Sequence, residues 1–226
     1  MSKSHFKYPF EMTDNPRSAR TRQRLLDAAA EVFAATGYRR ATIAEICRRA
    51  AANIAAVHYH FGGKQGLYAA VFDYAQQRAS TEEASTPPEE PSDPEERLRL
   101  QVTSFVRRLL DPRRPAWIAR LMAHELIEPS DVLDRLVRER MRANHEQIAR
   151  AVRDLLGPDA APETVRLCTL SVISQCVFYR HSAAVVTRLY PEIVPSREIE
   201  RIAAHVTQFS LAAIRGLADN GKANHA

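Results

Sequence analysis

The 226-residue sequence has little glycine, little cysteine and no long apolar run. Only seven glycines stand among many Ala, Leu, Arg and Glu residues, a balance that favours helices over sheet. No apolar run approaches the roughly 18 residues that cross a bilayer, so we expect no membrane contact. Residues 1–10 mix charged and aromatic side chains without a signal-peptide stretch, which predicts a cytoplasmic protein.

The three cysteines, Cys47, Cys168 and Cys176, are too few and too scattered for a disulfide framework, and none forms a CxxC pair. Each lies in an apolar helical context, which predicts buried free thiols. Cys168 and Cys176 stand about two helical turns apart, too far for an unstrained disulfide within one helix. A redox role for this pair is the minor alternative.

Enzyme motifs are absent as well: the sequence has no P-loop, no GxGxxG, no complete HExxH and no Ser/His/Asp set. His124-Glu125 begins a zinc motif, but position 128 is Glu rather than His. We therefore expect a protein that is not an enzyme and that uses neither a metal nor a cofactor.

Charge is divided among three blocks. Residues 1–80 hold 12 Lys and Arg against 6 Asp and Glu, and residues 97–226 hold 20 against 14. Between them, residues 81–96 hold seven acids and no base. The basic start suits a module that binds phosphates, and the acidic, proline-rich stretch is typical of a linker. The predicted organisation is an arm (1–16), a DNA-binding domain (17–79), a linker (80–96) and a C-terminal domain (97–226).

Local signals predict two short helices within residues 42–61. Thr42 and Glu45 form a capping box, and Asn53 is a second N-cap. Gly62 and Gly63 end the second helix. Two short helices in about 20 residues have the size of a helix-turn-helix, whose second helix enters the major groove of DNA.

The second of these helices has an inner and an outer face. Val57 and Phe61 face inward in the predicted helix, against the apolar side of the first helix. Small and aromatic side chains on the outer face can touch thymine methyl groups, and the histidines and tyrosine can donate to phosphates or base edges. The outer residues are Ile54, Ala55, Ala56, His58, Tyr59 and His60.

Residues 42–46 (TIAEI) and 59–68 (YHFGGKQGLY), preceded by 25–29 (LLDAA), resemble the TetR family of one-component regulators. The resemblance implies an all-α homodimer that binds a palindromic DNA operator and responds to a small-molecule effector. It also implies phosphate contacts from Thr42 and Lys64, flanking a recognition helix that Asn53 precedes. Such a protein associates with the nucleoid when it is bound to DNA.

Three positions depart from the family pattern. The turn commonly holds Gly where this chain has Ala51, which is strained if that position needs a positive φ. Ala55 stands where Gly is frequent, and His58 replaces an aromatic residue that is often Tyr. These departures keep open an alternative, a helical interaction module that has lost sequence-specific DNA binding.

The second half continues with helical periodicity and without strand alternation. Residues 120–127 (RLMAHELI), 133–137 (LDRLV), 165–172 and 174–180 are similar to a TetR subgroup that includes regulators of cefoperazone and chloramphenicol sensitivity. This resemblance implies control of efflux or transport genes and of the protein's own gene, with repression as the family default.

A ligand pocket between helices needs apolar walls with a few converging polar groups. Gln175 is the most suggestive polar candidate, because a buried amide needs partners, although a neighbouring helix can supply them. Trp117 and Tyr179 can equally be core residues, and Arg120 with Glu125 a surface ion pair. The candidate walls are Phe105, Trp117, Leu121, Met122, Cys176 and Tyr179, and the candidate polar groups are Arg120, His124, Glu125, Gln175 and His181.

The last two long helices carry more apolar surface than a monomer covers. In the resemblance, they pair with the same helices of a second copy, which holds two recognition helices at the spacing of a DNA turn. The predicted interface residues are Ile173, Val177, Ile202, Val206, Phe209 and Ala213.

Overall fold

The computed structural model describes residues 16–80 and 91–223, and all regular structure within these ranges is helical. The all-α prediction is confirmed; nearly all of the expected N-terminal arm and most of the expected linker lie outside the described residues. The elements are α1 (Pro16–Arg40), α2 (Ile43–Ala50), α3 (Ile54–Phe61), α4 (Lys64–Ser80), α5 (Pro94–Leu110), α6 (Ala116–Ile127), α7 (Asp131–Leu136), a π-helical turn η1 (Val137–Met141), α8 (Arg142–Leu156), α9 (Pro162–His181), α10 (Ala183–Leu189), a 3₁₀ turn η2 (Pro195–Arg197) and α11 (Ile199–Ala223).

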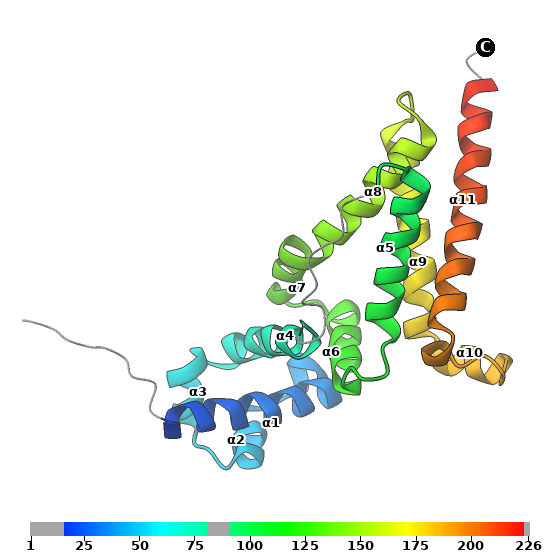
Figure 1. Cartoon of the computed structure of the whole chain (residues 1–226). Helices are drawn as coiled ribbons and strands as arrows, with labels where there is room; N and C mark the ends of the chain where they lie inside the picture. Colours follow the sequence, from blue (N-terminus) through cyan, green and yellow to red (C-terminus); the bar gives the residue numbers. More distant parts are fainter. Residues whose placement is uncertain (1–15, 81–90, 224–226) are drawn as a thin grey trace, which may run out of the picture. The chain divides into compact units, whose positions relative to one another are not determined.

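The helices form two compact units (Figure 1). The first contains α1 to α4 together with α6. Its centre is an aromatic cluster in which the Tyr68 ring lies 4.8 Å from the rings of both Phe33 and Tyr38, and 5.2 Å from that of Phe72. Phe33 and Tyr68 are completely buried. This cluster fixes α4 on α1 and so positions the chain that leads out of α3.

The membership of α6 in the first unit requires a correction to the sequence division, which placed all of residues 97–226 in one C-terminal domain. The helix packs against α1, where Leu121 and Glu125 are fully buried. Near its start, the Trp117 ring stacks on Tyr74 of α4 at 6.0 Å. The acidic linker marks a change in composition, but packing of α6 decides which core this segment joins.

The second unit contains α5 and α7 to α11. Helices α5, α8, α9 and α11 all contact one another, and Figure 1 shows α5, α9 and α11 running side by side. Their shared core holds residues such as Leu98, Ile148 and Val206, each at most 1% exposed. Surface ion pairs join the same helices: the Arg107 Nε lies 2.7 Å from a Glu200 oxygen, and Arg97 pairs with Asp154.

All three cysteines are free and buried, as predicted. Burial raises the pKa of the Cys176 thiol to about 12, so the thiolate needed for disulfide chemistry is scarce at neutral pH. Within the described ranges, no helix is both long and apolar enough to cross a bilayer.

Candidate nucleic-acid interface

Two side-chain caps define the helices of the helix-turn-helix. The Thr42 Oγ1 accepts a hydrogen bond from the backbone N–H of Glu45 at 3.2 Å, and the Asn53 Oδ1 accepts one from the N–H of Ala56 at 2.8 Å. Both capping residues have extended backbone angles. The caps therefore start α2 and α3 where the sequence predicted, and the amide nitrogen of Asn53 remains available to donate at the exposed end of α3.

The turn between α2 and α3 requires a left-handed residue, and that residue is Ala51. Its φ and ψ are 47° and 50°, and it is the non-glycine residue with a positive φ in the described chain. The N–H groups of Ala51 and Ala52 donate to the carbonyls of Arg48 and Cys47 at 3.3 and 3.0 Å. The turn thus closes α2 with the geometry that glycine favours, and Ala51 bears the steric cost of its Cβ.

Helix α3 exposes one face and buries the other. Ile54 is 53% exposed and Tyr59 75% exposed, whereas Val57 is completely buried. Ala55 and His58 are also exposed, while Ala56 and His60 are partly buried. The exposed residues recur at the spacing that places them on one side of a helix. This side is the predicted groove face.

Phe61, predicted as a core residue, is only partly buried. The Arg22 guanidinium of α1 lies 5.4 Å from the centre of its ring, a cation–π contact. The contact places a cation of α1 beside the end of α3. The sequence alone does not separate a phosphate-binding arginine of α1 from a solvated one, and this tertiary contact places Arg22 next to α3.

Gly66 permits a close approach that sequence reasoning missed. A Cβ at this position would lie 1.8 Å from the carbonyl oxygen of Phe61, a distance that no side chain can occupy. The first turn of α4 therefore lies directly against the last residue of α3. The signal was present in the motif YHFGGKQGLY, where Gly66 stands inside a helix that would otherwise favour alanine.

Lys64, at the start of α4, lies beside the end of α1. Its Nζ donates to the carbonyl of Arg39 at 3.3 Å and lies 4.7 Å from the centre of the Tyr38 ring. Partial burial lowers the pKa of this ammonium group. An ammonium group has three donors, so two remain for a phosphate at the beginning of α4.

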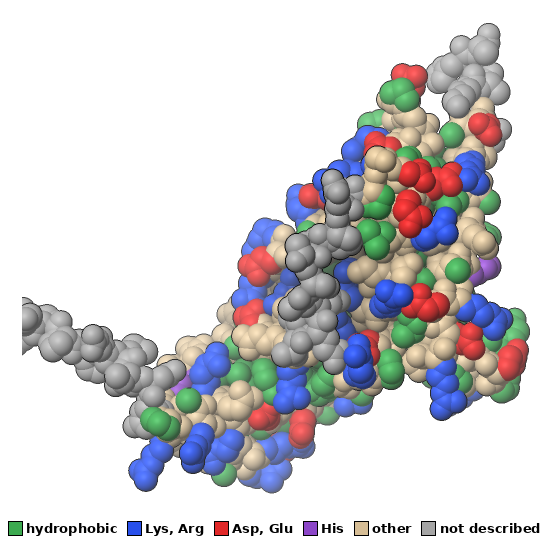
Figure 2. Space-filling model, in the orientation of Figure 1, with side chains coloured by type: hydrophobic (Ala, Val, Ile, Leu, Met, Phe, Trp, Pro, Cys, Tyr) green, Lys and Arg blue, Asp and Glu red, His purple; other side chains and the backbone are tan. Residues whose placement is uncertain are grey.

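Basic side chains gather over α1 and α2 (Figure 2). Two of them are partly neutralised, because Arg48 and Arg49 both donate to Glu45, at 2.8–2.9 Å and 2.6 Å. These hydrogen bonds lower the pKa of Glu45 to about 2. The arginines at the start of α1 are exposed instead, and they supply the positive surface next to α3.

Family models match both halves of the chain. The model described as "Bacterial regulatory proteins, tetR family" matches residues 25–71, and the C-terminal domain of the HTH-type transcriptional dual regulator CecR matches residues 94–214, which is more than half of the chain. The chain belongs to the TetR family. Both resemblances drawn from the sequence are confirmed, and the matched families are transcriptional regulators rather than enzymes.

Two curated proteins are similar to part of this TetR-family chain. The A-factor receptor protein of Streptomyces griseus is 36% identical over 76 residues, covering 34% of this chain and 28% of the relative. The regulator SrpR of Pseudomonas putida is 49% identical over 51 residues, covering 23% of this chain and 24% of the relative. The chain thus matches only about a quarter of the length of these curated relatives.

Solved structures share the fold along most of the chain. MexZ of Pseudomonas aeruginosa has a TM-score of 0.60 and 23% identity, covering 87% of this chain and 95% of its own. HlyIIR, a hemolysin II regulator, has a TM-score of 0.53 and 21% identity, covering 84% and 98%. At these identities the likeness establishes the TetR fold.

The predicted ligand residues of α6 lie in the first unit of this TetR-family regulator. Leu121 and Glu125 are buried in its core, and the His124 ring lies against Gly37, where a Cβ would be 3.1 Å from the His124 Nδ1. Glu125 is fully buried whereas Arg120 is exposed, so the two do not form the surface pair that the sequence allowed as an alternative. Trp117 and Met122 are partly buried.

The remaining ligand candidates lie in the second unit and do not share one cavity there. Cys176 is a core residue, Phe105 packs against the same core, and His181 is exposed. The Gln175 Nε2 donates to the Ser210 Oγ of α11 at 3.3 Å, so a neighbouring helix supplies its partner. Tyr179 lines a hollow of about 260 Å³.

The predicted dimer residues divide between buried and exposed positions of α9 and α11. Ile202 and Val206 are 5% and 1% exposed and belong to the core of their own chain, because the inner side of α11 packs on α5. Ile173 and Val177 are partly buried, whereas Phe209 and Ala213 are exposed. The structure adds other exposed apolar residues on α9 and α11: Leu167, Leu170, Phe178 and Leu217.

Proposed function

We propose that this TetR-family regulator is a repressor that binds a palindromic operator as a homodimer and leaves it when a small molecule binds its C-terminal half. The observation that carries the DNA-binding part is the face of α3. Ile54, Ala55, His58 and Tyr59 are exposed together on a helix short enough to lie in a major groove. Apolar groups on this face suit thymine methyls, and His58 and Tyr59 can donate to base edges or phosphates.

The flanking residues supply the phosphate contacts of this proposal. Thr42 lies at the start of α2, Lys64 at the start of α4 and Arg22 beside the end of α3. Helix N-termini and cations favour anions. Contacts of this kind fix the register of the protein on DNA and carry no sequence information themselves, so we assign the reading of sequence to α3.

The homodimer is supported by the exposed apolar face of α9 and α11. Leu167, Leu170 and Phe178 on α9 and Phe209 on α11 are each about half exposed or more. Two packed helices with such a face can pair with the same two helices of a second copy. A two-fold contact would place two α3 helices about 34 Å apart, the spacing of successive major grooves on one side of DNA.

The targets that we propose are efflux or transport genes and the regulator's own gene. The match to the CecR C-terminal domain supports this proposal. MexZ, which shares the fold, is described as a key repressor responsible for antibiotic resistance in Pseudomonas aeruginosa. Release by a small molecule would be a shift in population between forms that bind the operator and forms that do not. Repression of transport genes is the expected role, and the site of action is DNA in the cytoplasm.

The test is a gel shift with DNA from directly upstream of the protein's own gene, next to an unrelated fragment, at two salt concentrations. We expect a complex on the upstream fragment that survives the higher salt. Tyr59→Ala should weaken this complex, while the matched control Tyr190→Ala, an exposed tyrosine of the second unit, should not. If the wild-type protein and both variants bind the two fragments equally, and all these complexes are lost at the higher salt, operator recognition by α3 is contradicted.

A further inference from the structure

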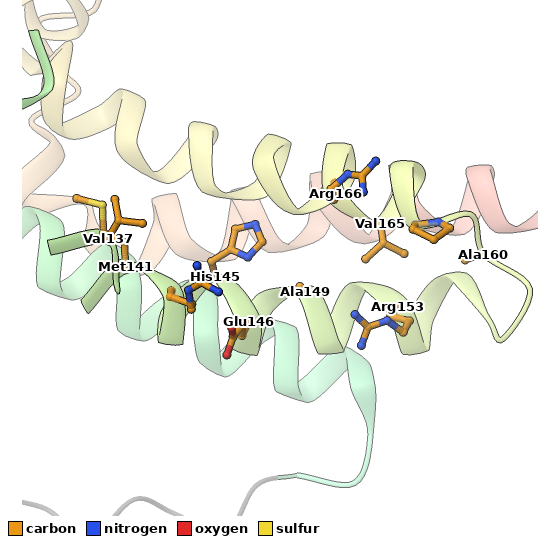
Figure 3. Close-up of a pocket in the computed structure, with 11 residues that line it drawn as sticks. Val137, Met141, His145, Glu146, Ala149, Arg153, Ala160, Val165 and Arg166 are labelled. Atoms are coloured by element: carbon orange, nitrogen blue, oxygen red, sulfur yellow. The ribbon is translucent and has the colours of Figure 1, made fainter. Parts of the chain in front are cut away.

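The second unit contains a groove that sequence reasoning did not predict. It has a volume of about 700 Å³ and lies between η1 and α8 on one side and the start of α9 on the other (Figure 3). Sites for small molecules typically measure about 300–1,000 Å³, so the groove has the size of a ligand site. The lining residues on which the inference depends are Met141, Arg142, Ala149, Arg153, Val165 and Arg166.

The charge of the lining is strongly unbalanced. The lining contains three arginines, Arg142, Arg153 and Arg166, and one carboxylate, Glu146. Within the described residues, none of these three guanidinium groups forms an ion pair, although other arginines of the same unit, such as Arg97 and Arg107, do. A groove lined by three cations and a single carboxylate favours an anion.

The floor of the groove is apolar. Ala149 and Val165 are buried, and Met141, farther along the groove, is partly buried. Val137, Met141, His145, Ala149 and Arg153 follow one another along η1 and α8 in Figure 3. The stripe from Met141 to Arg153 is about 18 Å long at 1.5 Å per residue. The shape therefore suits an elongated molecule with an apolar body.

We infer that this groove binds an amphipathic anion, a molecule with a carboxylate or phosphate group on an elongated apolar body. The acidic group would lie on the cations of the lining, Arg142, Arg153 and Arg166, because a guanidinium group matches the two oxygens of a carboxylate or phosphate. The apolar body would lie on Met141, Ala149 and Val165. The inference rests on the proposed ligand-responsive function and names the chemical class of the effector and a site for it.

The test uses the full chain and two probes of this class, decanoate and decyl phosphate, with binding measured by titration calorimetry. Replacing both cations, Arg153→Gln with Arg166→Gln, should weaken binding of both probes about tenfold or more. The matched control, Arg99→Gln with Arg188→Gln, removes two exposed arginines of the same unit outside the groove and should leave binding unchanged. Equal weakening in both double variants would show only a general charge effect and would overturn the site.

A second variant tests the apolar floor without a change of charge. Ala149→Phe should fill the groove and abolish binding of both probes, while circular dichroism verifies that the helices remain. Decanol and decyltrimethylammonium share the chain but lack the acidic group, so they should bind at least about tenfold more weakly than decanoate. If these two bind as well as decanoate, the groove does not select anions and the inference fails.

The outcomes for the groove and for the proposed function are separable, because operator binding is measured independently. The inference is supported if decanoate releases the wild-type protein from its operator and if Arg153→Gln with Arg166→Gln weakens decanoate binding about tenfold or more. Operator binding with no decanoate or decyl phosphate binding overturns the inference and leaves the DNA-binding proposal intact. If the arginine variants instead turn a dimer into a monomer, the groove is an interface between copies and the inference is also overturned.

Discussion

The hydroxyl of Tyr68 on α4 donates a hydrogen bond of 2.7 Å to a carboxylate oxygen of Glu125 on α6, and both residues are completely buried. The bond joins two segments that stand 57 positions apart, on opposite sides of the acidic linker. Helix α4 follows α3 directly, and α6 is covalently flanked by α5 and α7 of the second unit. A displacement of α6 would therefore act on α4 through this bond.

Tyr68→Phe should lower the free energy of unfolding of the first unit by about 1–3 kcal/mol, because the buried carboxylate loses a donor. Unfolding in urea can be followed by the fluorescence of Trp117, the single tryptophan, which stacks on Tyr74 in the same unit. The control Tyr59→Phe removes a hydroxyl from an exposed ring and should change the free energy by less than about 0.5 kcal/mol. Equal effects of the two substitutions would contradict the importance of the buried bond.

The buried tyrosines should make stability fall at alkaline pH. Burial, and then the bond to Glu125, raises the pKa of Tyr68; burial, and then the bond to Asp27, raises that of Tyr74. A tyrosine whose pKa is higher in the folded chain stabilises the fold fully below its unfolded pKa of about 10, and this contribution is lost as pH rises above that value.

Unfolding in urea at a series of pH values measures this effect. The decline above pH of about 10 should be less steep when Tyr68→Phe and Tyr74→Phe are combined. The combination of Tyr59→Phe and Tyr190→Phe removes two exposed phenols and should keep the wild-type slope. If the free energy of unfolding of the Tyr68→Phe and Tyr74→Phe variant falls with pH as steeply as that of the wild-type protein, other groups cause the loss of stability at alkaline pH.

Ala51→Gly should stabilise the protein. An L-residue in the left-handed region costs about 1–2 kcal/mol, and glycine avoids this cost but loses more backbone entropy on folding. We expect a net gain of about 0.5–1 kcal/mol in the free energy of unfolding. The control Ala44→Gly, at an exposed helical position of α2, should instead lose up to about 1 kcal/mol. A loss in both variants would contradict the positive φ at Ala51.

Features that depend on neighbouring residues could be predicted from the sequence, whereas features that depend on tertiary packing could not. Thr42, Asn53 and Gly62 act within a few residues of themselves, so the ends of α2 and α3 could be predicted. Burial of Val206 depends on the packing of α11 against α5, and periodicity alone cannot tell which side of an apolar helix meets its own chain. Arg142, Arg153 and Arg166 resemble ordinary solvated charges in the sequence, and only the fold brings them to one groove.

Gly66→Ala should impair operator binding more than it impairs folding. The added methyl group collides with the Phe61 carbonyl and has to move the start of α4 away from the end of α3. This shift would displace Lys64 relative to the recognition helix and weaken the phosphate contact that we propose. We expect a loss of about tenfold or more in operator affinity, measured by gel shift. Gln65→Ala, on the exposed side of the same turn, is the control and should retain most of the affinity.

Phe209→Glu should break the proposed dimer. The ring is 59% exposed in the single chain, on the apolar face of α11, and a carboxylate there would lose its water in the proposed contact without gaining a partner. Such a residue at the centre of an interface contributes about 2 kcal/mol or more. Sedimentation should therefore show monomers at concentrations where the wild-type protein is dimeric, and operator affinity should fall because each monomer reaches a single half-site.

Leu189→Glu, a 67% exposed position on α10, introduces the same charge away from this face and should leave the dimer intact. If Phe209→Glu stays dimeric, a second substitution on α9, Leu170→Glu, decides the matter: a dimer that survives both changes is held together by another surface.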